Sequence, residues 1–132
     1  MLEIAVSVDL LTSDDTRGGG KEIQNPTWEQ VKAEILEMDG EQYTSVGMMV
    51  GDDDHLMIGG GGTHYIVSVR DGDRLCAINN PNGDPERMVE VCVGEPSNFP
   101  EDELVGLDEA LNAARWYFEH HTPEPNLPWK DA

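Results

Sequence analysis

The chain has 132 residues, the usual size of one domain, and 27 Asp and Glu residues against 8 Lys and Arg give it a formal net charge of −19. Such a surface repels phosphate backbones and anionic lipids, so we expect no direct nucleic-acid partner and no membrane partner. The charge favours a basic protein as partner, because complementary fields speed association. Solubility alone is the alternative reason for the acidity.

We expect no export signal at the N-terminus, because Met1-Leu2-Glu3-Ile4 has an acid where a signal peptide needs a basic region. No stretch reaches the 18 or more continuous apolar residues of a membrane span. We therefore expect a cytoplasmic protein, and a single domain over residues 1–132, since no repeat or interdomain linker interrupts the sequence.

The first predicted element is a strand over residues 2–10, where apolar and polar side chains alternate. A flexible loop is expected over residues 12–21, which contain Gly18-Gly19-Gly20. A helix then begins at Thr27, because Thr27 and Gln30 have the spacing of a capping box. Its apolar stripe should face a sheet and end before Gly40; the stripe is Trp28, Val31, Ile35 and Met38.

Residues 43–93 are predicted to form short strands separated by turns, because apolar residues alternate between turn-forming segments. The turn at Asp71-Gly72 is the strongest hairpin signal, and the run Gly59–Gly62 is expected to break a strand. The last strand is expected at residues 89–93. Sequential strands with short connections favour an antiparallel meander.

A second helix is predicted over residues 107–120, with acids in its first turn and His120-His121 at its end. Three prolines prevent its continuation, and the tail around Trp129 is apolar enough to pack back on the domain. The fold class is therefore α+β: a single antiparallel sheet of about five or six strands, packed by two helices.

The sequence contains candidate chemical groups, but their spacing does not favour a catalytic or metal site. Neighbouring side chains of Asp52-Asp53-Asp54-His55 point to opposite faces of an extended segment, so they cannot converge on one ion. The run Gly59–Gly62 precedes a strand rather than the helix that a phosphate site requires. We expect no metal and no cofactor.

Cys76 and Cys92 lie inside apolar, strand-like runs and are predicted to be buried, reduced thiols. A disulfide between neighbouring strands is the alternative. A nucleophilic cysteine would need an activating histidine and partial exposure. We therefore predict that the protein is not an enzyme, with a small enzyme using Cys76 or Cys92 as a further hypothesis.

The C-terminal stretch Ala110–Phe118, followed by Pro123 and Leu127-Pro128-Trp129, resembles the first-numbered immunity-protein family of bacterial polymorphic toxin systems. That family's chains end in an "A-L-x-A-A-x-x-F-F" helix, a proline and then a tryptophan. Members often place Gly between the aromatic pair and the proline, where this chain has His120, His121 and Thr122. The departure implies a different way of ending the helix.

The resemblance implies an inhibitor that binds and occludes a toxin inside the producing cell, most often a nucleic-acid (cytidine) deaminase. A deaminase must hold nucleic acid and so carries a basic groove, for which an acidic domain is a suitable partner. The chain lacks the H-x-E and P-C-x-x-C signature of the deaminases themselves. A generic acidic adaptor or nucleic-acid mimic, which binds many basic proteins weakly, is the competing hypothesis.

Two acidic segments are the predicted toxin-binding residues. The first is Asp52, Asp53 and Asp54, and the Gly-rich turn is expected nearby. Tyr65 is the anchor residue predicted for this segment, and a core position is the alternative for it. The second is Glu101, Asp102 and Glu103, before the second helix. We favour the first segment, because consecutive acids beside a mobile turn can adapt to a cleft lined by Arg and Lys.

Overall fold

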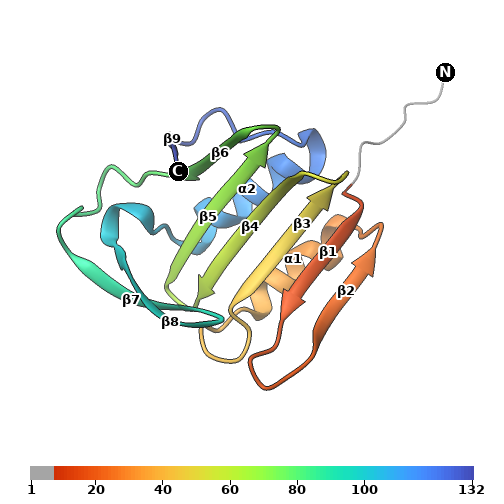
Figure 1. Ribbon diagram of the computed structural model, residues 1–132, viewed down its shortest axis with the longest axis horizontal. Coiled ribbons are helices and arrows are strands. Elements are labelled where there is room, and N and C mark those ends of the chain that lie inside the picture. Colours follow the sequence, from red (N-terminus) through yellow and green to blue (C-terminus); the bar gives the residue numbers. More distant parts are fainter. Residues whose placement is uncertain (1–7) are drawn as a thin grey trace.

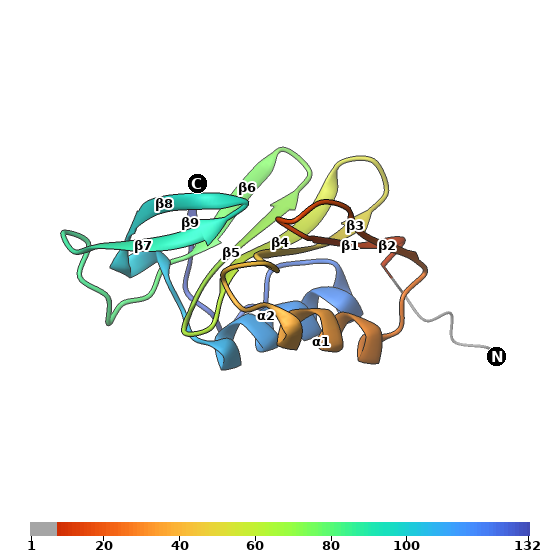
Figure 2. The same cartoon turned by 90° about the horizontal axis from the view of Figure 1, so that it is seen from below.

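The computed structural model describes residues 8–132. The strand predicted over residues 2–10 lies outside the described residues except at its last three positions. The fold has two layers, in which both helices cover the same face of a large antiparallel sheet (Figures 1 and 2). The predicted α+β class is confirmed, with seven strands in this sheet and two more in a separate hairpin.

The large sheet has the strand order β2-β1-β3-β4-β5-β6-β9. All its neighbouring strands are antiparallel, and from β3 to β6 they follow one another along the chain as the meander predicts. The strands are β1 (Leu10–Asp14), β2 (Gly20–Gln24), β3 (Ser45–Val50), β4 (Asp54–Gly61), β5 (His64–Asp71), β6 (Arg74–Ile78) and β9 (Trp129–Asp131).

The loop predicted over residues 12–21 is wrong, because β1 and β2 form a hairpin there. Leu11 pairs with Ile23, and Leu11 is buried in the core. The alternation of apolar residues therefore runs beyond residue 10, and the glycine run only supplies the turn that brings β2 back.

Helix α1 (Trp28–Glu37) begins as predicted. The Thr27 hydroxyl accepts a hydrogen bond from the Gln30 N–H at 3.2 Å, and the Thr27 N–H donates to Gln30 Oε1 at 2.9 Å, so the capping box is confirmed. Val31 and Ile35 are fully buried against the sheet. Met38 follows as the helix cap, and Gly40 lies just beyond it.

Helix α2 (Leu107–His120) has the predicted bounds. It ends at His121, whose φ of 60° is left-handed and whose N–H donates to the Tyr117 carbonyl at 2.8 Å. Helices commonly end with glycine in this conformation. Here histidine adopts it, which is the different helix end that the missing glycine implied.

The prediction that residues 89–93 form the last strand is wrong. Strand β7 (Met88–Val93) is followed by β8 (Glu95–Pro100), a short 3-10 helix (Glu101–Glu103) and, after α2, strand β9. Trp129 in β9 pairs with Ile78 and packs partly buried against the core, and its indole N–H donates to the Glu124 carbonyl at 2.8 Å. The tail therefore packs back as expected.

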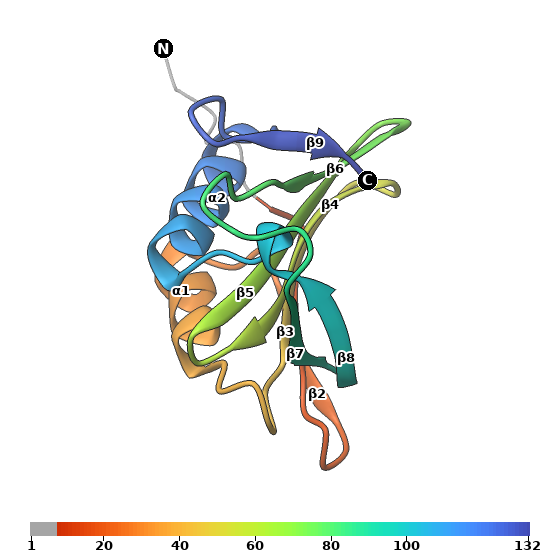
Figure 3. The ribbon, with the colours of Figure 1, turned by 90° about the vertical axis from the view of Figure 1, so that its left-hand side faces the viewer.

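The glycine run was expected to break a strand, but Gly59, Gly60 and Gly61 continue β4. A Cβ at Gly59 would lie only 2.7 Å from Val93 Cγ2, and one at Gly60 would lie 3.0 Å from Val91 Cγ1. The missing side chains thus let the β7–β8 hairpin approach the sheet backbone, a use of glycine within strands. Figure 3 shows this hairpin on the side of the sheet opposite the helices.

Candidate protein-binding site

Asp52 and Asp53 are exposed in the turn between β3 and β4, and Asp54 is the first residue of β4. Asp54 Oδ1 accepts a hydrogen bond from the Gly72 N–H at 2.8 Å. This contact brings the β5–β6 turn, with Asp71 and Asp73, beside the β3–β4 turn. We call this set the acidic turns: Asp52, Asp53, Asp54, Asp71 and Asp73.

The acidic turns carry charge that the protein does not neutralise. None of their carboxylates lies within 4.0 Å of a Lys, Arg or His nitrogen in the described part of the chain. Arg74 follows Asp73 directly, but its guanidinium pairs with Asp131 at 3.2 Å instead. Asp71 and Asp73 are not among the binding residues predicted from the sequence, although both lie at the predicted hairpin turn.

The Gly-rich turn does not lie beside Asp52–Asp54. Strand β4 runs from Asp54 to Gly61, so the two segments occupy opposite ends of it. Tyr65 is the second residue of β5, at the glycine end, and is only 3 % exposed, with its backbone paired to Val105. Burial raises the pKa of its phenol. The structure places Tyr65 in the core and not next to the acidic turns.

The second predicted segment, Glu101–Glu103, lies in the 3-10 helix and is tied to its surroundings. Glu101 pairs with Arg87 at 3.3 Å and accepts a hydrogen bond from the Asp84 N–H at 2.8 Å. Glu103 pairs with Lys130 at 3.6 Å. Two of the three carboxylates are therefore already partnered within the protein.

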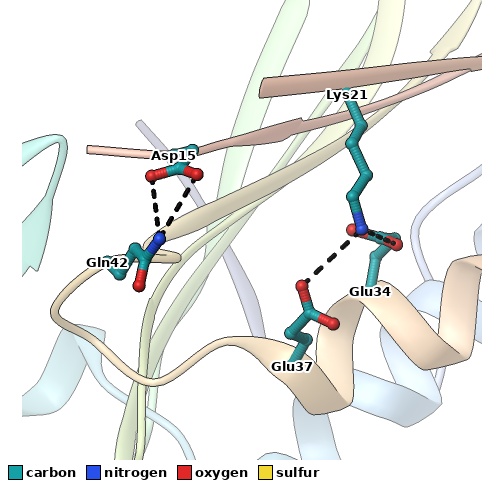
Figure 4. Close-up of polar contacts among 5 residues, drawn as sticks. All are labelled: Asp15, Lys21, Glu34, Glu37 and Gln42. Atoms are coloured by element: carbon teal, nitrogen blue, oxygen red, sulfur yellow. Dashed lines mark hydrogen bonds and ion pairs between the residues drawn. The ribbon is translucent and has the colours of Figure 1, made fainter. Parts of the chain in front are cut away.

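Asp15 and two acids of α1, Glu34 and Glu37, are also partnered (Figure 4). Lys21 Nζ lies 3.3 Å from Glu34 and 3.7 Å from Glu37. The hydrogen bond to Glu34 and the charges of both glutamates raise the pKa of Lys21. The Gln42 amide donates to both oxygens of Asp15 at 3.2 and 3.3 Å. The acidic turns thus differ from Glu34 and Glu37 in having no ion-pair partner within residues 8–132.

The cysteines are free thiols. Cys76 is buried as predicted, whereas Cys92 is partly exposed, because β7 lies in the outer hairpin. Desolvation raises the pKa of both thiols, and the charges of Asp14, Glu90 and Glu95 add to the rise at Cys92. The thiolate that a nucleophilic cysteine needs is therefore disfavoured at both positions.

Within residues 8–132, no three His, Cys, Asp or Glu side chains are grouped so as to hold a metal ion. Neither described helix has the length and apolar character needed to cross a membrane.

These features define a small acidic α+β protein with surface carboxylates that have no ion-pair partner within residues 8–132. The family model of immunity protein Imm1 matches residues 19–131, which is nearly the whole chain. The chain therefore belongs to the Imm1 family of immunity proteins, and the resemblance drawn from its C-terminal residues is confirmed. A comparison with curated proteins finds no match.

Proposed function

We propose that this immunity protein binds a cognate toxin domain that acts on nucleic acid, most specifically a cytidine deaminase, and blocks its substrate groove in the cytoplasm of the producing cell. Membership of the Imm1 family supports a toxin as partner. The deaminase identity comes from the family resemblance and from charge. A groove that grips nucleic acid must be basic, and this domain has a net charge of −19.

The observation that carries the proposal is the set of unpaired carboxylates in the acidic turns. An acid that is already ion-paired has lost much of its long-range field, whereas an unpaired acid still attracts a basic partner. We propose that Asp52, Asp53 and Asp54 meet Lys and Arg side chains at the rim of the toxin's groove. Glu101, Asp102 and Glu103 form the second acidic segment to be tested. The inhibitor acts as one domain, stoichiometrically, and without a cofactor or catalytic step.

The test uses the toxin domain encoded beside this gene. Deamination of cytosine in a single-stranded oligonucleotide is measured with rising amounts of the immunity protein. We expect inhibition to be complete at a molar ratio of one to one, and co-expression to protect cells from the toxin. An unrelated basic protein of similar size is the control ligand. Equal, weak binding of both would favour the adaptor hypothesis, and a toxin that the protein binds but that does not deaminate nucleic acid would refute the deaminase proposal.

A further inference from the structure

The face of the sheet opposite the helices is covered at one end only. Strands β7 and β8 pack there, where Val93 and Ile66 lie against the position of Gly59. Figure 2 shows the β7–β8 hairpin and the turns β3–β4 and β5–β6 all on this side of the sheet. Between them lies the uncovered part of this face of the sheet.

The strand register identifies the side chains of this surface. Met48, Leu56 and Val69 are fully buried on the helix side, so their neighbours along each strand point the opposite way. Met49 pairs with His55, and His55 pairs with Arg70, which gives a row of partly exposed side chains across three strands. The next row contains Met57 and Ser68. We call this set the open face: Leu10, Met49, His55, Met57, Ser68 and Arg70.

The centre of the open face is apolar and adaptable. Met49 and Met57 converge over Gly47, because a Cβ there would lie 2.6 Å from Met57 Sδ and 3.0 Å from Met49 Cε. Methionine side chains are flexible and polarizable, and proteins use them at surfaces that must fit a partner. Leu10 extends this apolar area, because it pairs with Met49 on the neighbouring strand.

The charges around this centre have a definite arrangement. Figure 2 shows the β3–β4 turn, with Asp52 and Asp53, and the β5–β6 turn, with Asp73, rising on the side of the open face. Asp54 and Asp71 alternate onto the same side as Leu56 and Val69, so only the tips of the acidic turns border the open face. Arg70 is partly exposed and makes no ion pair within residues 8–132. An apolar centre with an arginine and a charged rim matches the anatomy of protein interfaces.

The helix side of the protein carries both ion-paired and unpaired acids. Lys21 pairs there with Glu34 and Glu37, and Arg115 pairs with Glu119 at 3.0 Å. The exposed acids Glu29, Asp108 and Glu109 make no ion pair within residues 8–132. The apolar centre formed by Met49 and Met57, together with the acidic turns, therefore distinguishes the open face.

We infer that the open face is the surface that receives the cognate toxin domain, an inference that rests on the proposed function. The toxin surface that fits it has an apolar centre bordered by Lys and Arg. Those cations meet the acidic turns, while Arg70 meets a hydrogen-bond acceptor of the toxin. The acidic turns then serve as the rim of the interface, and Met49 and Met57 form its centre.

The experiment compares two variants that add the same arginine to opposite faces. Ser68→Arg places it on the open face, and Ala33→Arg places it on the exposed side of α1. Both change the net charge equally, so only the position differs. Affinity for the toxin domain encoded beside this gene is measured by titration calorimetry, and thermal unfolding confirms that each variant is folded. We expect Ser68→Arg to raise Kd at least about tenfold and Ala33→Arg to change it less than about twofold.

A second pair removes apolar character without adding charge. Met49→Gln changes the centre of the open face, and Met88→Gln makes the same change at a 55 % exposed methionine of β7. Only Met49→Gln should weaken binding of the toxin domain. If Ser68→Arg does not fold, this second pair tests whether the open face is the binding surface.

The outcomes separate this inference from the proposed function. If the parent protein does not bind the toxin domain, the proposed function fails, and this inference falls with it. If the parent binds and the open-face variants bind equally well, the inference alone is wrong. Loss of binding in Ala33→Arg would instead place the toxin on the helix side.

Discussion

Two acid-rich segments of this protein, Asp52–Asp54 and Glu101–Glu103, look alike in sequence but have different roles in the structure. In the second segment, Glu101 is paired with Arg87 and Glu103 with Lys130. The backbone there is also held, since the Asn80 N–H donates to the Asp102 carbonyl at 2.6 Å. In the first segment the carboxylates have no ion-pair partner within residues 8–132.

This comparison teaches that the number of acids in a segment does not measure the charge it can offer to a partner. Acids paired within the chain contribute to local structure, and their field is largely cancelled by the neighbouring cation. Acids left unpaired in a tight turn add little to stability and retain their field. We therefore expect substitutions in Glu101–Glu103 to affect unfolding, and substitutions in Asp52–Asp54 to affect binding.

The largest difference in stability between the two segments is expected when a glycine that lies beside each of them is replaced by alanine. A Cβ at Gly83 would lie 2.5 Å from the Glu101 carbonyl oxygen and 2.6 Å from Asp102 Cα, so Gly83→Ala forces the backbone apart. We expect a loss of about 2–3 kcal/mol in the free energy of unfolding. Gly51, next to the first segment, has a φ of +61° and nothing within 4 Å of its Cβ position. Gly51→Ala should cost about 1 kcal/mol from backbone strain alone. Urea unfolding of both variants measures the difference, and equal losses would show that the two segments are equally constrained.

A smaller difference in stability is expected when a single carboxylate of each segment is replaced by alanine. Glu101→Ala removes the ion pair with Arg87 and the acceptor of the Asp84 N–H, both at the surface, at a cost of about 1 kcal/mol in stability. Asp53→Ala, in an exposed turn without an ion pair, should change stability by less than about 0.5 kcal/mol. Denaturant midpoints at constant slope provide the measurement. A larger loss in Asp53→Ala than in Glu101→Ala would contradict the comparison.

Part of this contrast could be predicted from the sequence and part could not. Local signals were sufficient for both helices, because the capping box at Thr27 and the apolar stripe of residues 107–120 are short-range patterns. The hairpin turn at Asp71-Gly72 was found for the same reason. The β1–β2 hairpin was missed because charged and glycine residues hid a continued alternation, and β8 was missed because Glu95–Pro100 contains two prolines and little apolar alternation.

The partners of the acids depend on tertiary contacts that no local pattern contains. Glu103 and Lys130 are far apart in sequence and meet only because β9 returns to the edge of β6. The open face likewise follows from the strand register and from the position of the β7–β8 hairpin. The sequence could therefore name both acidic segments, but it could not distinguish the partnered segment from the free one.

A third prediction tests binding directly with two triple variants. Asp52→Asn, Asp53→Asn and Asp54→Asn together remove three charges while keeping the turn chemistry and an acceptor for the Gly72 N–H. We expect association with the toxin domain to slow about tenfold at low salt. The matched control, Glu101→Gln with Asp102→Asn and Glu103→Gln, removes three charges that are mostly paired and should slow association less. Stopped-flow mixing measures both rates, and a control that slows as much as the first variant would reverse our assignment of the two segments.

The smallest expected effect is a difference between the parent and the two triple variants in how strongly salt slows their association with the toxin domain. Free carboxylates act through a field that is screened over about 8 Å at physiological ionic strength, so the parent's association rate should fall several-fold between low and physiological salt. Dissociation should change little, because it depends on the short-range contacts of the bound interface. The Asn triple variant should show a shallower fall than the parent, whereas the control triple variant should keep nearly the parent's slope. Association rates measured over a salt series give all three slopes in one experiment. An association rate that does not respond to salt in the parent would mean that the acidity of the turns serves solubility and that the apolar centre of the interface guides binding without it.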